Sequence, residues 1–576
     1  MDLRLARALP LAAPLALIAI LLLPAPAEAQ HQPTISQSKA VEIAQQDPKA
    51  IRALREHPDL RPSASRSEST ADWEVGFFRG GEQVVQVVVD DVSGNILESW
   101  SGYQVAWRMA RGYPGAFGRA INSPWVWLPL CFIFVLGLVD WRRPFRLAHF
   151  DLVVIVAGFG LSHYFFNRGD IGVSVPLAYP PLLYLLGRAL WMGFRRSRGG
   201  WLRPSAPIAV LAALTVLLVG ARGFLNVTNS NVIDVGYSGV IGADRIADGT
   251  TLYGNFPDDD SSGDTYGPVA YYAYVPFEQA LPWSGVWDDL PAAHAAAIFF
   301  DLGTMVGLFL IARRLRSGPE GNRLGVILCF GWAACPYTAF ALESNTNDAL
   351  VSLTLVAALL ALDSAPARGV LLALSSMTKF APIPLAPLFA TYGATERGSG
   401  GLRRYARVAA PFLAAFAVTV LAVSAQALFD PGLDTYWHRT IAEQGGRDSP
   451  FSVWGQSPSL GWLQAVVKAG VVGLALLVAF RPKLRDPVTV AALGTALLIG
   501  MELVIDHWFY LYIPWFLPFL LIALLGGAVV ELGGGDHDRL DPASEPVISD
   551  LDRGAHHPDV VVGGVETHRH LRAKGL

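Results

Sequence analysis

Residues 206–224 read APIAVLAALTVLLVGARGF, an apolar block as long as a helix needs to cross the hydrocarbon core of a bilayer. Of the 576 residues in the chain, 52% are hydrophobic and 16% are charged, whereas soluble proteins average about 25% charged residues. The apolar residues gather in blocks and do not follow the amphipathic periods of a large soluble core. The sequence therefore predicts a helical membrane protein with many spans.

Further apolar blocks follow the same pattern on both sides of this one. They occupy 124–140, 149–167, 174–194, 292–313, 324–342, 347–363, 367–392, 405–429, 460–480, 487–506 and 508–531. The block 367–392 is too long for one simple span and carries Lys379 and three prolines at its middle, which predicts two short helices that meet near the outer face. With these halves counted separately, we expect about thirteen crossings.

The loops between the blocks alternate in charge. With the N-terminal part outside, the inner loops include DWRRPFR (140–146) and RRSRGGWLRP (195–204), and each inner loop is basic. The outer loops, of which 225–291 and 430–459 are the longest, are acidic or mixed. Because cytoplasmic loops carry the excess of Lys and Arg, we expect a multi-pass plasma-membrane protein. Its N-terminal domain and two long loops would lie outside the cytoplasm.

The two ends of the chain predict processing and disorder. Residues 1–29 are expected to be a signal peptide, because Arg4 and Arg7 precede an apolar run and Ala27-Glu28-Ala29 offers a cleavage site; an uncleaved membrane anchor is the alternative. Residues 532–576 are rich in Asp, His and Gly and are expected to be a disordered cytoplasmic tail.

The net charge of −4 does not indicate a nucleic-acid partner, and the three cysteines form no disulfide framework or zinc spacing.

Residues 30–115 are polar and are predicted to form an extracytoplasmic α+β domain. A helix is expected from Ser38 to His57, followed after a Ser-rich break by strands at Trp73–Phe78 and Gln83–Asp90, with a hairpin turn between them. This helix and meander, which ends in VVVDDVSGNILE, resembles a PepSY domain. PepSY-like modules have no catalytic residues, so the resemblance implies an accessory binding or regulatory role.

The first long outer loop mixes acidic and aromatic side chains. Asp234 opens DVGYSGVIGADRIADG, which is predicted to be an interfacial amphipathic helix. A carboxylate there could take a proton from an acceptor hydroxyl, although a solvated aspartate or a helix cap is the alternative. Asp258-Asp259-Asp260 fits either a surface charge cluster or a weak divalent-ion site. A Gly-Pro turn lies beside Tyr266 and Tyr271, whose rings suit either a sugar face or an interfacial belt.

Cations near the outer side form a second group of candidates. Arg439 and Arg447 lie in the loop 430–459, where the positive-inside bias cannot explain them. A lipid phosphate would explain these arginines, since arginine binds phosphate through a bidentate fork. Salt bridges to neighbouring aspartates are the alternative explanation. Lys379 lies in a predicted membrane break, where an ionisable residue is a functional candidate. His507 lies at the outer edge of the last span as a functional or a simple interfacial histidine.

Lys379 also has candidate partners in the sequence. Glu343, Asn347 and Asp348 lie on the neighbouring short outer loop and could pair with it. Such a partner is expected because an unpaired charge is costly to bury.

Four passages resemble the GT-C superfamily of multispanning glycosyltransferases. They are DVGYSGVIGADRIADGTTLYG, GDTYGPVAYYAYVPFE, ALLALSSMTKFAPIPLAPL, and HRTIAEQGGRDSPFSVWGQ followed by DHWFYLYIPWFLPFLL. Together they cover roughly residues 206–531, and the nearest branch is the polyprenyl-phosphate-mannose-dependent alpha-1,2-mannosyltransferases and their actinobacterial relatives. Residues 116–205 would then be additional transmembrane helices outside the usual core.

The resemblance implies an inverting transfer of a sugar, plausibly mannose, from a polyprenyl phosphate to an extracytoplasmic glycan or glycolipid acceptor. It implies Asp234 as general base, with Asp244 as the second choice. The implied contacts to the donor phosphate are Lys379, Arg439, Arg447 and His507, and the expected sugar or acceptor contacts are Tyr237, Tyr266, Tyr271 and Trp454. No cofactor is expected beyond the lipid-linked donor, and the metal requirement is open. One departure is Trp508, which stands where many family members have proline.

A non-catalytic membrane sensor or transporter, with the PepSY-like module as its ligand reader, is the alternative. A transporter should carry paired ionisable residues at mid-membrane in related halves. The sequence shows no convincing half-to-half repeat, and Asp301 and Glu502 lie near span ends or singly. These features favour the enzyme.

Overall fold

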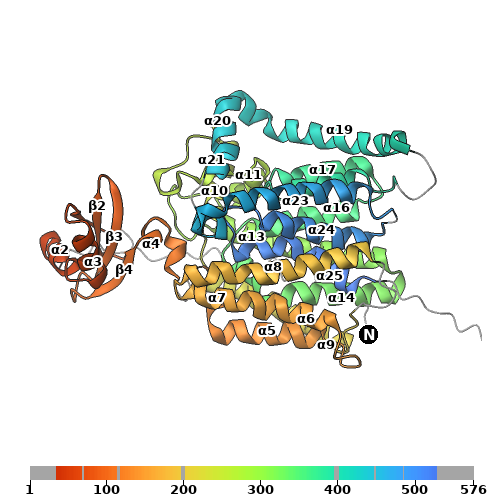
Figure 1. Cartoon of the computed structure of the whole chain (residues 1–576), viewed down its shortest axis with the longest axis horizontal. Coiled ribbons are helices and arrows are strands. Elements are labelled where there is room, and N and C mark those ends of the chain that lie inside the picture. Colours follow the sequence, from red (N-terminus) through yellow and green to blue (C-terminus); the bar gives the residue numbers. More distant parts are fainter. Residues whose placement is uncertain are drawn as a thin grey trace, which may run out of the picture. The chain divides into compact units, whose positions relative to one another are not determined.

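The computed structural model of this chain describes residues 34–67, 70–112, 117–195, 202–394, 401–446, 449–483 and 485–527. The expected signal peptide and the expected C-terminal tail lie outside the described residues. Arg447 also lies outside them, in the gap between 446 and 449. The described chain is mostly helical, with a small sheet near its N-terminus (Figure 1).

The N-terminal domain is a four-stranded antiparallel sheet backed by two helices. Its elements are α2 (Gln37–Ala44), α3 (Pro48–Glu56), β1 (Arg61–Arg66), β2 (Trp73–Arg79), β3 (Glu82–Val89) and β4 (Ile96–Ser101). The strand order β1-β2-β3-β4 is that of a meander. Alanines of the helices and alternate residues of the strands, including Val75, Phe77 and Val87, form a hydrophobic core belonging to this domain.

Two sequence expectations for this domain were wrong in detail. The single helix from Ser38 to His57 is two helices, because the Asp47 carboxylate caps a new helix by accepting from the Lys49 and Ala50 amides and Pro48 takes its first position. The Ser-rich break is partly strand β1, which pairs with β2 over its whole length. The hairpin turn lies where expected, with both Gly80 and Gly81 at positive φ.

Helices make up the rest of the described chain. The longer ones are α5 (Pro124–Leu138), α6 (Leu147–Val153), α7 (Phe159–Asn167), α8 (Ile171–Phe194), α9 (Ile208–Thr228), α10 (Asp234–Ala247), α13 (Pro291–Leu315), α14 (Gly318–Ala334), α15 (Pro336–Glu343), α16 (Asp348–Leu360), α17 (Ala365–Ser376), α19 (Gly401–Ala427), α23 (Gly461–Phe480), α24 (Pro487–Glu502) and α25 (Ile513–Leu525). Short helices between them include α4 (Tyr103–Ala106), α11 (Val269–Tyr272), α12 (Val275–Ala280), α18 (Ala386–Ala390), α20 (Leu433–Trp437), α21 (Glu443–Gly446) and α22 (Val453–Gln456).

Among the described residues, six helices are long and apolar enough to cross a membrane, or seven if α14 and α15 count as one broken span. These two helices meet at an angle of 60°. Four shorter apolar helices, α5, α16, α24 and the segment Tyr510–Leu525, lie beside the long ones. These long apolar helices support a membrane protein, and the thirteen crossings stay a prediction.

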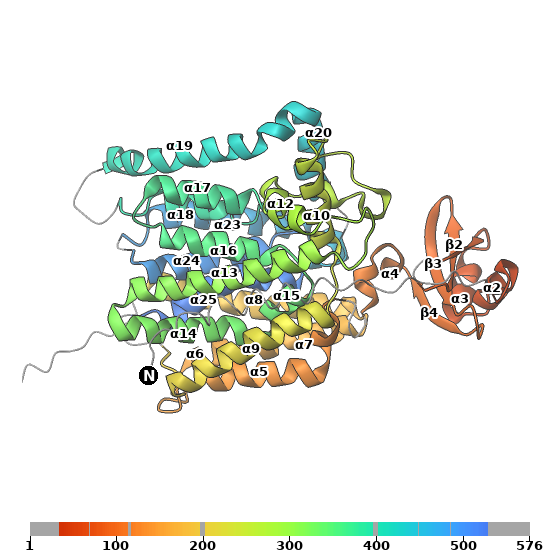
Figure 2. The ribbon, with the colours of Figure 1, turned by 180° about the vertical axis from the view of Figure 1, so that it is seen from behind.

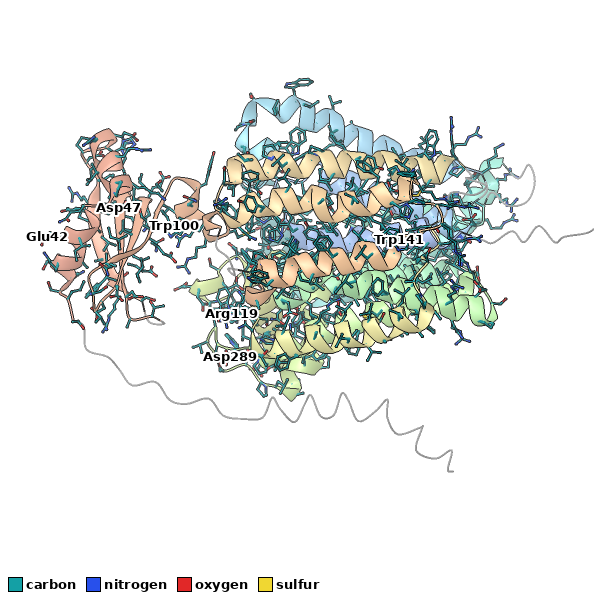
Figure 3. All side chains as sticks on the ribbon, turned by 90° about the horizontal axis from the view of Figure 1, so that it is seen from below. Glu42, Asp47, Trp100, Arg119, Trp141 and Asp289 are labelled. Atoms are coloured by element: carbon teal, nitrogen blue, oxygen red, sulfur yellow. The ribbon has the colours of Figure 1, made fainter. Side chains whose placement is uncertain are left out.

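The bundle has two distinct ends. Helices α10 and α20 lie at one end of the long helices in both Figure 1 and Figure 2. Trp141, from a basic loop, lies at the end of the bundle opposite to Arg119 and Asp289 (Figure 3). Asp289 belongs to the long loop 225–291, so this loop and the basic loop of Trp141 lie at opposite ends of the bundle (Figure 3).

A buried polar loop between α15 and α16 organises the end that carries the acidic loops. Every side chain from Glu343 to Asp348 is buried. The backbone N–H groups of Asn231 and Ile233 donate to the carbonyls of Glu343 and Ser344, at 3.3 Å each. This pairing places the first turn of α10 against the loop, and it does so immediately before Asp234.

Gly236 marks the closest approach of α10 to this loop. A Cβ atom at this position would lie 2.3 Å from the backbone oxygen of Asn345, a separation that forces the backbone to shift. Asn345 itself has a φ of +52°, so the loop has little freedom to yield.

Gly236→Ala is therefore expected to destabilise the protein by about 1–3 kcal/mol, the usual cost of overpacking. The measurement is thermal unfolding of the detergent-solubilised protein. Gly223→Ala in α9 is the matched control, because nothing lies within 4 Å of its added methyl group. Equal unfolding midpoints for the two variants would contradict the close packing of α10.

Candidate functional site

A cavity of about 450 Å³ opens at the end of the bundle where the acidic loops lie. Several sequence-predicted residues line it although they are far apart in the chain: Asp234, Tyr266, Lys379 and His507. They come from the start of α10, the loop before α11, the break after α17 and the segment after α24. Apolar side chains of α23, among them Val471 and Val472, form another part of the wall.

Asp234 is the first residue of α10 and is exposed to the cavity. Its own carboxylate accepts from the Val235 amide at 2.9 Å. Negative charge is favourable at a helix N-terminus because the first amides of the helix lack partners within it. Helix geometry therefore places an acid at the cavity mouth.

Lys379 lies in the unwound segment that follows α17, where the block 367–392 was expected to break. Its Nζ donates to Asp348 Oδ1 at 2.6 Å. The same oxygen accepts from Trp515 Nε1 at 2.8 Å. The predicted pairing with the neighbouring outer loop is thus observed, and Asp348 is the partner.

Three aromatic rings surround the Lys379 ammonium. It lies 5.5 Å from the ring centre of Tyr266 and 5.4 Å from those of Tyr512 and Trp515. Such faces attract a cation. An ammonium has three donors, and the Asp348 contact uses one, so Lys379 keeps donor capacity while it lines the cavity.

His507 lies at the other side of the cavity, in the segment between α24 and α25. Its Nδ1 is 2.9 Å from Ser449 Oγ. The ring packs on Trp107 and Phe451, with centroid separations of 5.6 and 5.3 Å. These contacts hold the imidazole in one place on the cavity wall.

Lys468 is a cavity residue that the sequence reasoning missed. It lies in α23, inside the apolar stretch GWLQAVVKAGVVGLALLVAF. Its side chain is exposed, and no ion pair or hydrogen bond joins it to another described residue. A lone lysine within a predicted span was the available signal, because ionisable residues there mark functional positions by default.

The two outer-loop arginines differ from this group. Arg439 donates from Nε to Asp264 Oδ2 at 2.8 Å and is not among the described residues that line the cavity. Arg439 therefore does make a salt bridge, but its partner is Asp264 of the other long loop and not a neighbouring aspartate of its own loop. Arg447 lies outside the described residues, so its role stays a prediction.

The remaining predicted site residues do not line the described part of the cavity. Tyr237 is buried, donates to Asp259 at 3.2 Å and stacks on Trp287. Tyr271 donates to the Gly263 carbonyl at 2.8 Å, and Trp454 to that of Leu503 at 2.9 Å. Asp244 is half-buried near the end of α10, and burial raises its pKa above the usual range, as do the charges of Asp248 and Glu278.

The aspartate run 258–260 is not simply a surface cluster, because Asp260 is buried. The Ser238 hydroxyl lies 2.7 Å from Asp260 Oδ2 and 2.6 Å from the Asp234 carbonyl oxygen. Burial raises the pKa of Asp260 to about 8. Since Ser238 has one proton for two acceptors, a protonated Asp260 satisfies the second contact as donor.

The cavity can hold an anionic group and accept a proton in one space. Lys379, Lys468 and His507 supply nitrogen donors, and Asp234, Asp348 and Asp506 supply carboxylates, of which Asp348 is already paired with Lys379. Across the described ranges no three His, Cys, Asp or Glu side chains gather as metal ligands would. No protein-family model matches this chain, and no curated protein is significantly similar to it.

Asp260→Asn is expected to raise the thermal-unfolding midpoint at pH 8.5 and to have little effect near pH 4. A carboxyl whose folded pKa is raised destabilises the fold progressively between its unfolded pKa of about 3.9 and the folded value, so the penalty is complete only above about pH 8. The asparagine amide can still donate to Ser238. The measurement is the thermal-unfolding midpoint of both proteins across pH 4–9. A difference in midpoint that does not change with pH would contradict the raised pKa.

Proposed function

We propose that this protein is a membrane glycosyltransferase that moves a sugar from a polyprenyl phosphate to an acceptor outside the cytoplasm. The observation that carries the proposal is the convergence of Asp234, Lys379 and His507 on one cavity. The GT-C resemblance implies these three residues as base and phosphate contacts. Lys468, which the resemblance did not include, adds a further cation to the same cavity.

The donor phosphate would lie among the nitrogen groups. Lys379 is held by Asp348 and aromatic rings, so its position is set before a ligand arrives. Lys468 reaches the cavity from the membrane-spanning helix α23. A lipid-linked donor suits this arrangement, because its phosphate can meet the lysines while its tail follows the apolar side chains Val471 and Val472.

Asp234 would act as general base. The acceptor hydroxyl attacks the anomeric carbon of the sugar and gives its proton to the Asp234 carboxylate. The bond from the anomeric carbon to the phosphate oxygen breaks, and polyprenyl phosphate leaves with the bonding electrons. Since the phosphate is already a good leaving group, alignment and charge stabilisation by the cations supply most of the remaining catalysis.

The transporter alternative gains one observation. Asp301 of α13 was expected to be single, yet its Oδ1 lies 2.6 Å from Nη2 of Arg222 in α9. Both helices are candidate membrane spans. The sequence could not show this pair because the two residues lie on different helices. Trp332 Nε1 also donates to Asp301, at 2.7 Å, and neither charged residue lines the cavity. A satisfied pair away from the cavity fits a structural connection between helices, so we retain the enzyme.

Asp234→Asn is expected to reduce sugar transfer by about 10²–10⁴-fold, the usual contribution of a general base. The measurement is incorporation of labelled mannose from polyprenyl-phosphate mannose in membranes that contain the variant. Asp248→Asn is the matched control, since Asp248 is exposed at the other end of the same helix. Full transfer by Asp234→Asn at normal expression would remove Asp234 from the base role.

Lys468→Met is expected to raise the KM for the lipid-linked donor about tenfold or more, because one cation of the phosphate site is lost. Folding should be retained, since Lys468 has no ion pair with another described residue. An unchanged donor KM in Lys468→Met would separate this lysine from the donor.

Lys379→Met removes a buried partner of Asp348 and should also destabilise the protein. The double change Lys379→Met/Asp348→Asn should restore stability without restoring transfer.

A further inference from the structure

The N-terminal sheet has one face covered by helices and one face open. Helices α2 and α3 pack on the face that carries Val75, Phe77 and Val87. On the opposite face lies a second cavity of about 200 Å³. Its walls are almost wholly polar: they include serines of β1, glutamines of β3 and two arginines that follow α4.

The floor of this cavity includes a row of paired residues that crosses three strands. Ser63, Gly76 and Gln86 are direct neighbours in the antiparallel register. The space directly over Gly76 is filled by the chain itself, because a Cβ atom there would lie 2.5 Å from the Phe78 ring and 2.7 Å from Gln83 Nε2. The Phe78 ring and the Gln83 amide therefore form the part of the cavity wall next to Gly76.

One side of the cavity is held by a chain of hydrogen bonds. Gln86 Nε2 donates to Glu74 Oε2 at 3.0 Å, and Gln86 Oε1 accepts from Arg111. Arg111 also donates through Nε to the Gln104 carbonyl at 2.8 Å, and its guanidinium lies over the Trp100 ring. These groups have fixed positions and present both donors and acceptors.

The rim differs from the floor because its polar groups are unused. The side chains of Ser63, Ser65, Gln83 and Arg108 line the cavity. None of them makes a side-chain hydrogen bond to another residue in the part of the chain that the structure describes. These hydroxyl, amide and guanidinium groups can therefore donate to or accept from a polar ligand in the cavity.

We infer that the face of this sheet opposite α2 and α3 binds a single sugar unit of an extracytoplasmic glycan, in the cavity beside Phe78 and Gln83. Each sugar hydroxyl both donates and accepts, which matches a wall of serines, glutamines, arginine and carboxylate. The Phe78 ring adds an apolar surface. Glu74 disfavours a phosphate, and the polar lining disfavours a lipid tail. The volume lies below the range of about 300–1,000 Å³ for drug-sized ligands, so one ring fills it.

The experiment uses the full chain in lipid nanodiscs and four probes: manno-, gluco-, galacto- and N-acetylglucosamine tetrasaccharides. Binding is measured by titration, and hydrogen exchange locates the protected segment. At least one probe should bind saturably and protect 73–89 from exchange. Ser63→Ala/Gln83→Ala should weaken this binding tenfold or more without unfolding, since the lost groups make no hydrogen bonds to other described residues.

Gln45→Ala/Gln46→Ala is the matched control, because both side chains are exposed at the end of α2 on the covered side of the sheet. Its affinity and its exchange pattern should equal those of the parent. The inference is overturned if no probe binds. It is also overturned if protection survives in Ser63→Ala/Gln83→Ala, or if extended peptides bind along the edge strand β1 in place of sugars. These results are independent of Asp234 and of sugar transfer.

Discussion

The buried loop from Glu343 to Asp348 is the constraint on which the cavity depends. Its backbone carbonyls accept from the segment before Asp234, and its Asn345 side chain donates to Ser230 Oγ and to the Asn231 carbonyl at 3.0 Å each. Its last residue, Asp348, accepts from Lys379 and Trp515. One short polar segment therefore positions both the acid and the central cation of the site. Buried backbone groups must find partners, and here those partners are the functional elements themselves.

Several buried carboxylates of the described chain pair with cations from other segments. Lys379 pairs with Asp348, Arg222 with Asp301, and Arg188 with Asp151. Each pair also receives a further hydrogen bond, from Trp515, Trp332 and Tyr184 respectively. An ionised side chain without such partners is expensive to bury. Lys468 follows another pattern: it lies on a helix face that the bundle leaves largely exposed and reaches the cavity without an ion pair among the described residues.

The sheet domain has a hydrophobic core of its own, built from α2, α3 and one face of the strands. Its other face carries a polar cavity that is not part of this hydrophobic core. The domain would thus add recognition of a glycan to a chain whose helical part carries the proposed transfer chemistry. The two proposals rest on separate cavities and separate residues, and either can stand without the other.

The sequence by itself determined the membrane-helical class, the α+β character of the first domain and the break at Lys379, because these depend on local hydropathy, turn residues and prolines. It could not determine which helices meet. Asp348 was one of three possible partners for Lys379, Asp301 was expected to be alone, and Arg439 was expected to hold a phosphate although it contacts Asp264. Only the tertiary structure decided these pairings and brought Asp234, Lys379, Lys468 and His507 to one cavity. The physical reason is that spacing along a chain sets the face of a helix, whereas packing between helices sets what that face meets.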